Sequence, residues 1–322
     1  MMSDSPKILL SIIIPVYNVS HYIERCVRSI KIDDISTEII LIDDGSNDGS
    51  SAICDQLSED IVPVRTIHTE NKGVSNARNL GILQSRGDWI IFVDGDDYLA
   101  SQALTAIESF LNNNVDLILH GWNYVNDSMV TISSCEFKDE CLSLEEACKK
   151  DVFCGFVWAY AFRRDIIIDN NILFSTNIQY AEDWEFIIKY YSYIRNKIVI
   201  LPDCLYNQVK RVGSATQQKL GEKYITDNFY MFGSVLRFSK NNTALRKMVI
   251  RKLHLLIKWF VNNVIYCSTD KHNLKRVYKR EWMIQAHTDI SFALHPIVFL
   301  PGIANQQIYF FICRIISIFS KK

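Results

Sequence analysis

The sequence lacks the cysteine pattern of zinc-binding proteins, the long apolar run of a membrane-spanning helix and the cleavage site of a secretory signal. Its nine cysteines form no CxxC pair and have no suitably placed histidines, so we expect reduced thiols rather than zinc ligands. The apolar stretch at residues 308–319 contains Arg314 and is shorter than the roughly 18–20 residues that a spanning helix needs. No cleavage site of a secretory signal follows the first apolar run. We therefore expect a cytoplasmic protein.

An excess of one charge sign is also missing. The 322 residues include 35 basic and 36 acidic side chains, for a formal net charge of −1, so no global field favours nucleic acid as a partner. Neither GxGxxG nor GxxxxGK occurs, which leaves dinucleotide-binding and P-loop classes without support. The length and the 48% apolar content are sufficient for one large or two ordinary folded domains.

Strand and helix patterns alternate over the first hundred residues. Apolar strand patterns at 8–14, 38–42, 62–67 and 88–93 alternate with helical patterns at 21–31, 47–57 and 74–84. A further helix is predicted at 102–112 and a strand at 115–120, with short strand-like pieces at 122–125 and 129–133. This order predicts an α/β fold with a mainly parallel sheet and helices on both faces.

The alternation stops at about residue 213. Helical patterns rich in aromatic and basic residues follow at 219–239, 243–267 and 273–285. We therefore predict a catalytic domain at residues 1–212 and a helical region at residues 213–322. Residues 305–322 are expected either to pack on the protein or to lie in a membrane interface, with a basic tail near anionic headgroups.

Three of the predicted strands end in polar clusters. These clusters read PVYN, DDGS and DGDD, and ligands of parallel sheets bind outside the carboxyl ends of the strands. In the third cluster Gly95 relieves crowding between Asp94 and Asp96. Such carboxylates can hold Mg²⁺ or Mn²⁺ against phosphate oxygens, although a solvated acidic turn would give the same pattern.

Four segments together resemble the family 2 glycosyltransferases, an inverting family with the GT-A fold. They are SIIIPVYN at 11–18, LIDDGSNDGS at 41–50, ENKGVSNARNLGI at 70–82 and GDWIIFVDGDDYL at 87–99. The resemblance is strong over about the first 100 residues and continues more weakly to about residue 212. It implies a Rossmann-like GT-A domain that binds a nucleoside-diphosphate sugar.

The resemblance implies that the first two strand ends hold the nucleoside, through Pro15, Tyr17, Asn18, Asp43 and Asp44. A carboxylate such as Asp44 can accept a hydrogen bond from a uracil-type imide, and Tyr17 offers a flat face to the base. The alternative is purely structural, because Asp44 also suits a turn and Asn47 a helix N-cap.

The same resemblance assigns residues to the diphosphate and the metal. Asn76 and Arg78 lie at the start of a predicted helix, where a guanidinium can grip phosphate, unless Arg78 is a solvated helix charge. Asp94 and Gly95 are expected beside the ribose and the metal, and Asp96 is expected to ligate Mn²⁺ or Mg²⁺. The ion would act as a Lewis acid on the departing nucleotide.

Asp97 is expected either to support this shell or to cap the next helix.

The segment at 180–186 resembles the family's Glu-Asp motif at the start of a helix. Asp183 is then expected to be the base that deprotonates the acceptor hydroxyl, with Glu182 as the second candidate. Acidic residues are also ordinary at helix starts, because they complement the helix dipole.

Two further segments resemble the family less closely. Trp158 could stack on an acceptor sugar or belong to the core. Arg211, in a segment at 201–214 that also contains Tyr206, could reach the diphosphate. Some relatives have histidine in this segment, so its absence here leaves a third metal ligand in doubt.

The favoured function is metal-dependent, inverting transfer of a sugar from a UDP-sugar to a hydroxyl of a glycan or lipid-linked glycan in bacterial surface polysaccharide synthesis. A nucleotidyltransferase is one alternative, although it would usually have a glycine- and lysine- or arginine-rich signature after the first strand. A non-catalytic binder of nucleotide sugars is another, and intact Asp96 and Asp183 argue against it.

Overall fold

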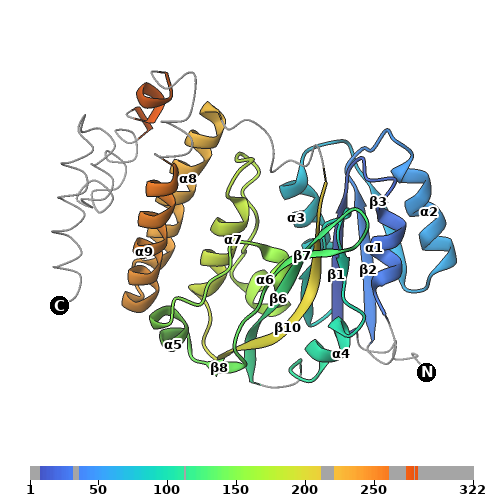
Figure 1. The fold of residues 1–322 in the computed structure, drawn as a ribbon, viewed down its shortest axis with the longest axis horizontal. Helices are drawn as coiled ribbons and strands as arrows, with labels where there is room; N and C mark the ends of the chain where they lie inside the picture. Colours follow the sequence, from blue (N-terminus) through green and yellow to red (C-terminus); the bar gives the residue numbers. More distant parts are fainter. Residues whose placement is uncertain are drawn as a thin grey trace. The chain divides into compact units, whose positions relative to one another are not determined.

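A computed structural model describes residues 8–31, 36–111, 114–211, 221–260, 273–278 and 280–281 (Figure 1). The chain divides into two compact units, the first made of residues 1–177 and 182–218 and the second of residues 178–181 and 219–322. The predicted domain boundary near residue 213 falls between residues 212 and 220, outside the described residues.

Four parallel strands form one half of the sheet in the first unit. They lie in the order β3-β2-β1-β4, and their bounds are β1 Leu10–Val16, β2 Thr37–Asp43, β3 Val64–His68 and β4 Trp89–Phe92. Every residue of β2 and β4 is buried, as expected for parallel strands covered on both faces. The predicted α/β fold is confirmed, and these four strands are the main parallel part of a sheet that is mixed as a whole.

The other half of the sheet is mixed. β9 (Tyr160–Arg163) lies antiparallel between β4 and β6 (Val115–Asn126), and β10 (Lys197–Lys210) runs parallel to β6. The edge strands are β5 Tyr98–Leu99, β7 Thr131–Cys135 and β8 Glu140–Leu142, which pair antiparallel with β10, β6 and β10. The predicted piece at 122–125 is therefore not a separate strand but the second half of β6.

Helices cover both faces of the parallel half. The contacts and Figure 1 place α1 (Ile23–Ser29) and α2 (Ser50–Asp60) on one side and α3 (Val74–Gln84) on the other. This is the arrangement that right-handed crossovers produce when strand order reverses after β3. The remaining helices of this unit are α4 Ala103–Glu108, the 3₁₀ turn Val157–Ala159, α5 Leu144–Lys149, α6 Arg164–Asp169 and α7 Glu182–Tyr191.

The second predicted helix begins later than expected. α2 starts at Ser50, directly after Gly49 in the left-handed region with φ 97°, whereas the sequence pattern placed its start at residue 47. The backbone N–H of Asn47 donates instead to Oδ1 of Asn18, 2.9 Å away. Asn47 therefore belongs to the loop that joins two strand ends, and its expected role as a helix N-cap is wrong.

The described residues of the second unit from 221 onward are mostly helical. They contain α8 (Glu222–Ser239), α9 (Thr243–Phe260) and a helical turn at residues 273–278. Residues 178–181 join this unit because Oδ2 of Asp227 accepts hydrogen bonds from the backbone N–H groups of Gln179 and Tyr180, at 2.7 and 3.2 Å. Among the described residues, no helix combines the length and apolar character needed to cross a bilayer. The expectation for residues 305–322 lies outside the described part of the chain.

Helix α3 packs closely on β1 through Gly81. A Cβ atom at this position would overlap Cγ2 of Ile13, whose side chain is fully buried in β1. The missing side chain therefore sets how near α3 approaches the sheet, and α3 also contains Arg78.

We expect Gly81→Ala to destabilise the protein by up to about 2 kcal/mol. Overpacking a core usually costs about 1–3 kcal/mol, and the higher helix propensity of alanine offsets about 1 kcal/mol of that cost. Urea unfolding of both proteins measures the difference, and Leu83→Ala, at a side chain of α3 that is 60% exposed, is the control. A variant about 1 kcal/mol more stable than the wild type would show that α3 moves away from β1 at no cost, because the gain in helix propensity would then appear undiminished.

Candidate active site

The ends of β1, β2 and β4 lie at one edge of the sheet. Val16 pairs with Asp43, and the N–H of Asp44 donates to the carbonyl of Val16 at 2.9 Å. On the other side of β1, the N–H of Val93 donates to the carbonyl of Ile13 at 3.0 Å. The three polar clusters therefore leave the sheet side by side, as the order of elements predicted.

Gly95 lets the DGDD turn pass over the end of β1. A Cβ atom on Gly95 would lie 3.1 Å from the carbonyl oxygen of Pro15 and 3.2 Å from Cγ2 of Val19. Any side chain here would push the turn away from β1. The glycine between Asp94 and Asp96 thus has a steric reason in the packing against Pro15.

Asp44 joins the end of β2 to the loop before α3. Its carboxylate is buried and accepts hydrogen bonds from the backbone N–H groups of Lys72 and Gly73, at 2.8 and 2.7 Å. Gly45, with φ 72°, packs so closely that a Cβ atom would lie 2.9 Å from the nitrogen of Asn71. The two loops that the resemblance assigns to the nucleotide are therefore fixed to each other.

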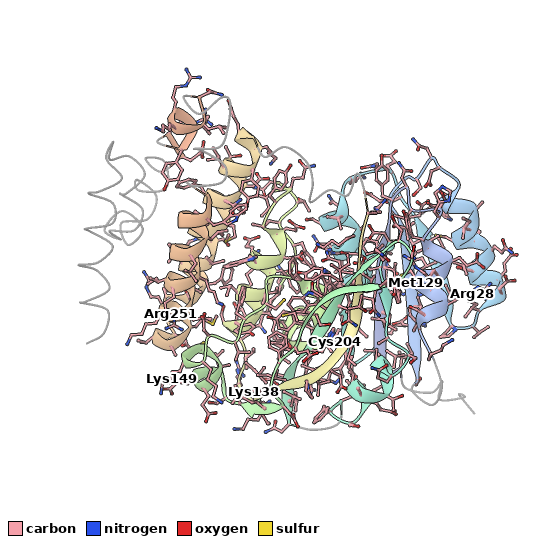
Figure 2. All side chains as sticks on the ribbon, viewed as in Figure 1. Arg28, Met129, Lys138, Lys149, Cys204 and Arg251 are labelled. Atoms are coloured by element: carbon pink, nitrogen blue, oxygen red, sulfur yellow. The ribbon has the colours of Figure 1, made fainter. Side chains whose placement is uncertain are left out.

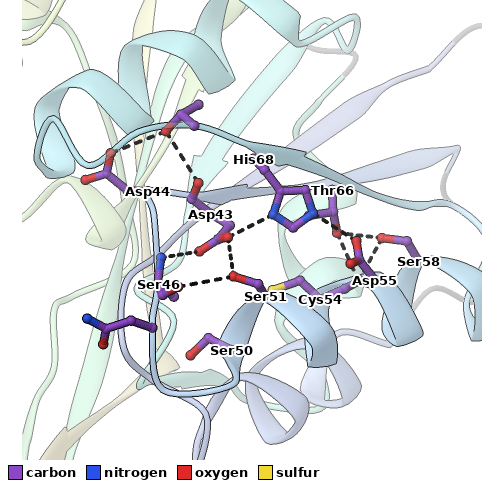
Figure 3. Close-up of polar contacts among 12 residues, drawn as sticks. Asp43, Asp44, Ser46, Ser50, Ser51, Cys54, Asp55, Ser58, Thr66 and His68 are labelled. Carbon is purple, nitrogen blue, oxygen red and sulfur yellow. Dashed lines mark hydrogen bonds and ion pairs between the residues drawn. The ribbon is translucent and has the colours of Figure 1, made fainter.

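The neighbouring Asp43 is held by a network that the sequence did not reveal (Figure 3). Its Oδ2 accepts from Oγ of Ser51 at 2.6 Å and lies 2.8 Å from Nδ1 of His68. Nε2 of His68 lies 2.9 Å from Oδ1 of Asp55. Burial alone raises the pKa of Asp43, but the hydrogen bonds from Ser46, Ser51 and His68 outweigh it and lower the pKa below its ordinary value. Hydrogen bonds to Asp43 and Asp55 raise the pKa of His68.

Tyr17 and Asn18 differ in their surroundings. Asn18 adopts φ 53° and connects the first two loops, since its N–H also donates to Oγ of Ser46 at 3.1 Å. The side chain of Tyr17 is 49% exposed. Asn18 therefore shapes the loop while Tyr17 leaves its ring accessible.

Arg78 connects the strand end to the acidic start of α7. Its Nη2 lies 2.9 Å from Oδ1 of Asp94, and its Nη1 lies 2.8 Å from Oδ1 of Asp183 and 3.6 Å from Oε1 of Glu182. The residue is only 4% exposed, and its guanidinium also lies over the ring of Phe174 at 5.3 Å. The alternative of a solvated helix charge is therefore wrong for Arg78.

The two acids at the start of α7 are unusually basic. Burial is the main reason that the pKa of Asp183 is raised; the negative charge of Asp94 adds to this effect, and Arg78 opposes it. Oδ2 of Asp183 also accepts from the N–H of Val157 at 3.2 Å. Burial and the charge of Asp183 raise the pKa of Glu182 to about 7. An acid with a pKa near neutrality is suited to proton transfer.

The other two acids of the DGDD turn have separate partners. Oδ2 of Asp96 accepts from Nε and Nη2 of Arg211, at 2.9 and 2.7 Å. Asp97 is buried and accepts from Oη of Tyr206 and from the N–H of Val209, both at 2.7 Å. Asp97 thus anchors the turn to β10, which fits the supporting role and not the helix cap.

Two remaining candidates have local partners. The side-chain amide of Asn76 donates to the carbonyl of Lys72 at 2.6 Å and so stabilises the loop before α3. Trp158 is 2% exposed and stacks on Tyr206, with ring centroids 4.3 Å apart. Trp158 therefore belongs to the core, and stacking on an acceptor sugar is excluded by its burial.

Asp94 and Asp96 offer the hard oxygen ligands that Mg²⁺ and Mn²⁺ prefer. Among the described residues, no group of three or more His, Cys, Asp or Glu side chains could hold a metal ion by itself. Mg²⁺ commonly takes only one or two carboxylates and completes its shell with substrate phosphates and water. The donor set therefore fits a metal that binds together with a diphosphate.

This fold and edge define an α/β domain with acidic and polar side chains at the carboxyl ends of its parallel strands. Residues 11–169 match the family model described as Glycosyl transferase family 2. Uncharacterized glycosyltransferase EpsJ of Bacillus subtilis is 36% identical over 189 residues, which cover 55% of this chain and 54% of EpsJ. Poly(ribitol-phosphate) beta-N-acetylglucosaminyltransferase TarS of Staphylococcus aureus is 26% identical over 272 residues, which cover 82% of this chain and 46% of TarS.

Solved structures agree on the fold. The complex of TarS residues 1–349 with UDP-GlcNAc superposes with a TM-score of 0.68 at 18% identity, covering 91% of this chain and 90% of that one. The mannosyltransferase PcManGT from Pyrobaculum calidifontis, in complex with GDP-Man and Mn²⁺, superposes with a TM-score of 0.53 at 14% identity, covering 92% and 87%.

The region at residues 11–169 is a domain of glycosyl transferase family 2, as the four motifs indicated. The GT-A fold is likewise confirmed. The chain spans about half the length of EpsJ and of TarS.

The raised pKa of Glu182 predicts a pH-dependent loss of stability. A carboxyl whose pKa is raised from 4.5 in the unfolded chain to about 7 in the folded protein stabilises fully below pH 4.5, and this contribution is lost as pH rises through 7. Glu182→Gln removes the ionisation. The difference in the free energy of unfolding between Glu182→Gln and the wild type should therefore shift in favour of the variant by about 1–3 kcal/mol as the pH rises from 5 to 8.

Urea unfolding at several pH values measures this gain. Glu145→Gln, whose side chain is 65% exposed on α5, is the matched control for losing one carboxylate. A difference between Glu182→Gln and wild type that stays constant with pH would contradict the raised pKa.

Proposed function

We propose that this chain is an inverting glycosyltransferase that transfers a sugar from a UDP-sugar to a hydroxyl of a glycan or lipid-linked glycan. The observation that carries the proposal is that Arg78 forms ion pairs with both Asp94 and Asp183. One guanidinium holds an acid from the nucleotide edge of the sheet next to an acid at the start of α7. In the proposed reaction the donor and the attacking hydroxyl would meet at this junction.

The donor would bind at the first two strand ends. The exposed ring of Tyr17 supports stacking on the base, and the buried carboxylate of Asp44 supports a hydrogen bond to the imide of uracil, since each carboxylate oxygen has two lone pairs. Pro15, Asn18 and Asp43 would shape these loops around the nucleoside. TarS, which has the same fold, forms a complex with UDP-GlcNAc, and this supports a uridine nucleotide.

The diphosphate would lie between the start of α3 and the DGDD turn. Asp94 and Asp96 would hold Mn²⁺ or Mg²⁺, which supplies Lewis-acid charge for the departing UDP. The complex of PcManGT with Mn²⁺ supports a metal in this fold. Asn76 would fix the loop beside the phosphates, and Arg78 would add positive charge near them.

Asp183 would act as the general base. It accepts the proton of the acceptor hydroxyl while that oxygen attacks the anomeric carbon, and the bond between this carbon and the UDP oxygen breaks on the opposite face. The result is inversion at that carbon. The raised pKa of Asp183 supports this role, because a more basic carboxylate takes a proton more readily. Glu182 is the second candidate for the same step.

The acceptor would be a growing polymer of the bacterial cell surface. TarS is named for a transfer to poly(ribitol-phosphate), and this supports a cell-surface acceptor for the present chain. The enzyme would work in the cytoplasm, peripherally bound to the inner face of the cell membrane. Residues 213–322 would form the separate helical region that approaches the membrane or a partner.

We expect Asp183→Asn to lower kcat for transfer from the donor by about 10²–10⁴-fold, the usual contribution of a general base. Its affinity for UDP in the presence of Mn²⁺ should stay within about twofold of the wild type, because Asn keeps the shape of Asp without its charge. Release of UDP from a panel of UDP-sugars and calorimetric titration with UDP measure the two quantities. Asp165→Asn, at a side chain of α6 that is 57% exposed, is the control.

Three outcomes separate the proposed reaction from its alternatives. A wild-type protein that binds UDP but does not liberate UDP from any UDP-sugar would be a non-catalytic binder. Release of pyrophosphate from a nucleoside triphosphate and a sugar phosphate would identify a nucleotidyltransferase. Undiminished turnover by Asp183→Asn would show that another group is the base, and Glu182→Gln then tests the second candidate.

A further inference from the structure

Arg211 is paired with the carboxylate of Asp96, which is one of the two expected metal ligands. Two of its nitrogens, Nε and Nη2, donate to the same oxygen, Oδ2 of Asp96, at 2.9 and 2.7 Å. The two side chains are 25% and 23% exposed, so the pair is partly shielded from water. The guanidinium also lies 5.0 Å from the ring centroid of Tyr22, which adds a cation–π contact.

The backbone of Asp96 is fixed independently of its carboxylate. Nη2 of Arg25 donates to the carbonyl oxygen of Asp96 at 3.0 Å, and this guanidinium lies over the rings of Tyr22 and Tyr98 at 5.4 and 5.1 Å. The turn therefore does not need Arg211 to hold its main chain. Both hydrogen bonds from Arg211 to Asp96 go to the carboxylate.

A guanidinium and a divalent ion compete for one oxygen. An ion bound at Oδ2 of Asp96 would lie within a few ångström of two N–H donors of Arg211, where like charges repel strongly and the existing hydrogen bonds would be lost. Asp94 cannot compensate fully, because its Oδ1 is already paired with Arg78. Each of the two expected metal ligands therefore has an arginine partner. The partner of Asp94 is Arg78 of α3, and the partner of Asp96 is Arg211, which directly follows β10.

We propose that Arg211 is an internal counter-cation that excludes the divalent ion from Asp96 until the donor binds, and that it then turns to the diphosphate of the donor. This inference rests on the proposed function. It makes metal and donor binding cooperative, because the diphosphate supplies a new partner for Arg211 as it brings ligands for the metal. The cooperativity is reciprocal: UDP strengthens the binding of Mn²⁺ by the same factor as Mn²⁺ strengthens that of UDP.

The test is a titration with Mn²⁺ in the absence of nucleotide, in which electron paramagnetic resonance measures the concentration of free Mn²⁺. We expect Arg211→Gln to bind Mn²⁺ about fivefold more tightly than the wild type, the factor that corresponds to a favourable partly exposed ion pair. Arg211→Lys should fall between the two, since it keeps the charge but loses the paired donors. Asp96→Asn should bind more weakly than all three.

A second titration, with saturating UDP, tests the release of Arg211. UDP should strengthen Mn²⁺ binding more in the wild type than in Arg211→Gln, because only the wild type has an arginine to transfer to the diphosphate. Arg28→Gln is the matched control. This arginine lies on α1, labelled in Figure 2, is 52% exposed and pairs with Glu24. Circular dichroism and thermal melting verify that each variant is folded.

The results distinguish this inference from the proposed function. Equal or weaker Mn²⁺ binding by Arg211→Gln, or no binding by either protein, would overturn the competition at Asp96. An equal effect of UDP on the two proteins would overturn the transfer to the diphosphate. Absence of UDP binding and of turnover in the wild type would contradict the proposed function, whereas the nucleotide-free titration reports on Arg211 regardless.

Discussion

The buried guanidinium of Arg78 is the interaction on which the site depends. Without it, the carboxylates of Asp94, Glu182 and Asp183 would lie close together with little solvent to separate their charges. A buried charge is tolerated only when it is paired and hydrogen-bonded. Arg78 meets this condition through two nitrogens that reach different parts of the chain. It is therefore both the electrostatic centre of the site and the link between the sheet and α7.

The position of Arg78 follows from packing below it. Gly81 is one helical turn further along α3 and allows the helix to approach Ile13 of β1. At the other end of the helix, Asp44 fixes the preceding loop through two backbone N–H groups. The helix is thus held at both ends against the strands whose tips form the site. A shift of α3 would move the guanidinium away from acids that it has to balance.

The arginines also divide the acids of the DGDD turn by role. Asp94 faces Arg78 and the proposed base, Asp96 faces Arg211, and Asp97 is buried against Tyr206. The three aspartates of this turn therefore lie in three different environments. In this arrangement positive charge from the protein itself is already present beside the proposed metal ligands. Under the proposal above, donor binding would exchange these partners rather than fill an acidic site without counter-charges.

The sequence predicted the parallel half of the fold well, because buried parallel strands and their polar ends leave strong patterns. β1, β2 and β4 and the polar clusters at their ends were found in this way. The antiparallel strand β9 was missed, since a short run such as Tyr160–Arg163 has no periodicity to separate it from its surroundings. Contacts between distant segments were missed for a different reason. Neither the bond of His68 to Asp43 nor that of Tyr206 to Asp97 follows from local sequence.

A partial signal for these contacts was present. His68 stands at the end of β3, the strand next to β2, so strand order would have placed it at the same edge as Asp43. Tyr206 lay in a segment already compared with the family. The predicted phosphate contact of Arg78 and the base role of Asp183 concern bound states, and both remain predictions.

The most direct test of the central role of Arg78 is a double-mutant cycle with Asp183, measured as free energies of unfolding in urea. Removing the cation from a buried cluster of acids costs about 3–5 kcal/mol, so Arg78→Met should be strongly destabilising. Asp183→Asn should cost less, because the raised pKa of Asp183 means that its negative charge is unfavourable in the folded protein. If the two side chains stabilise each other, the double variant should be more stable than the sum of the single effects by about 1–3 kcal/mol. Additivity within about 0.5 kcal/mol would contradict the account, because it would mean that the ion pair between Arg78 and Asp183 contributes nothing to the folded state.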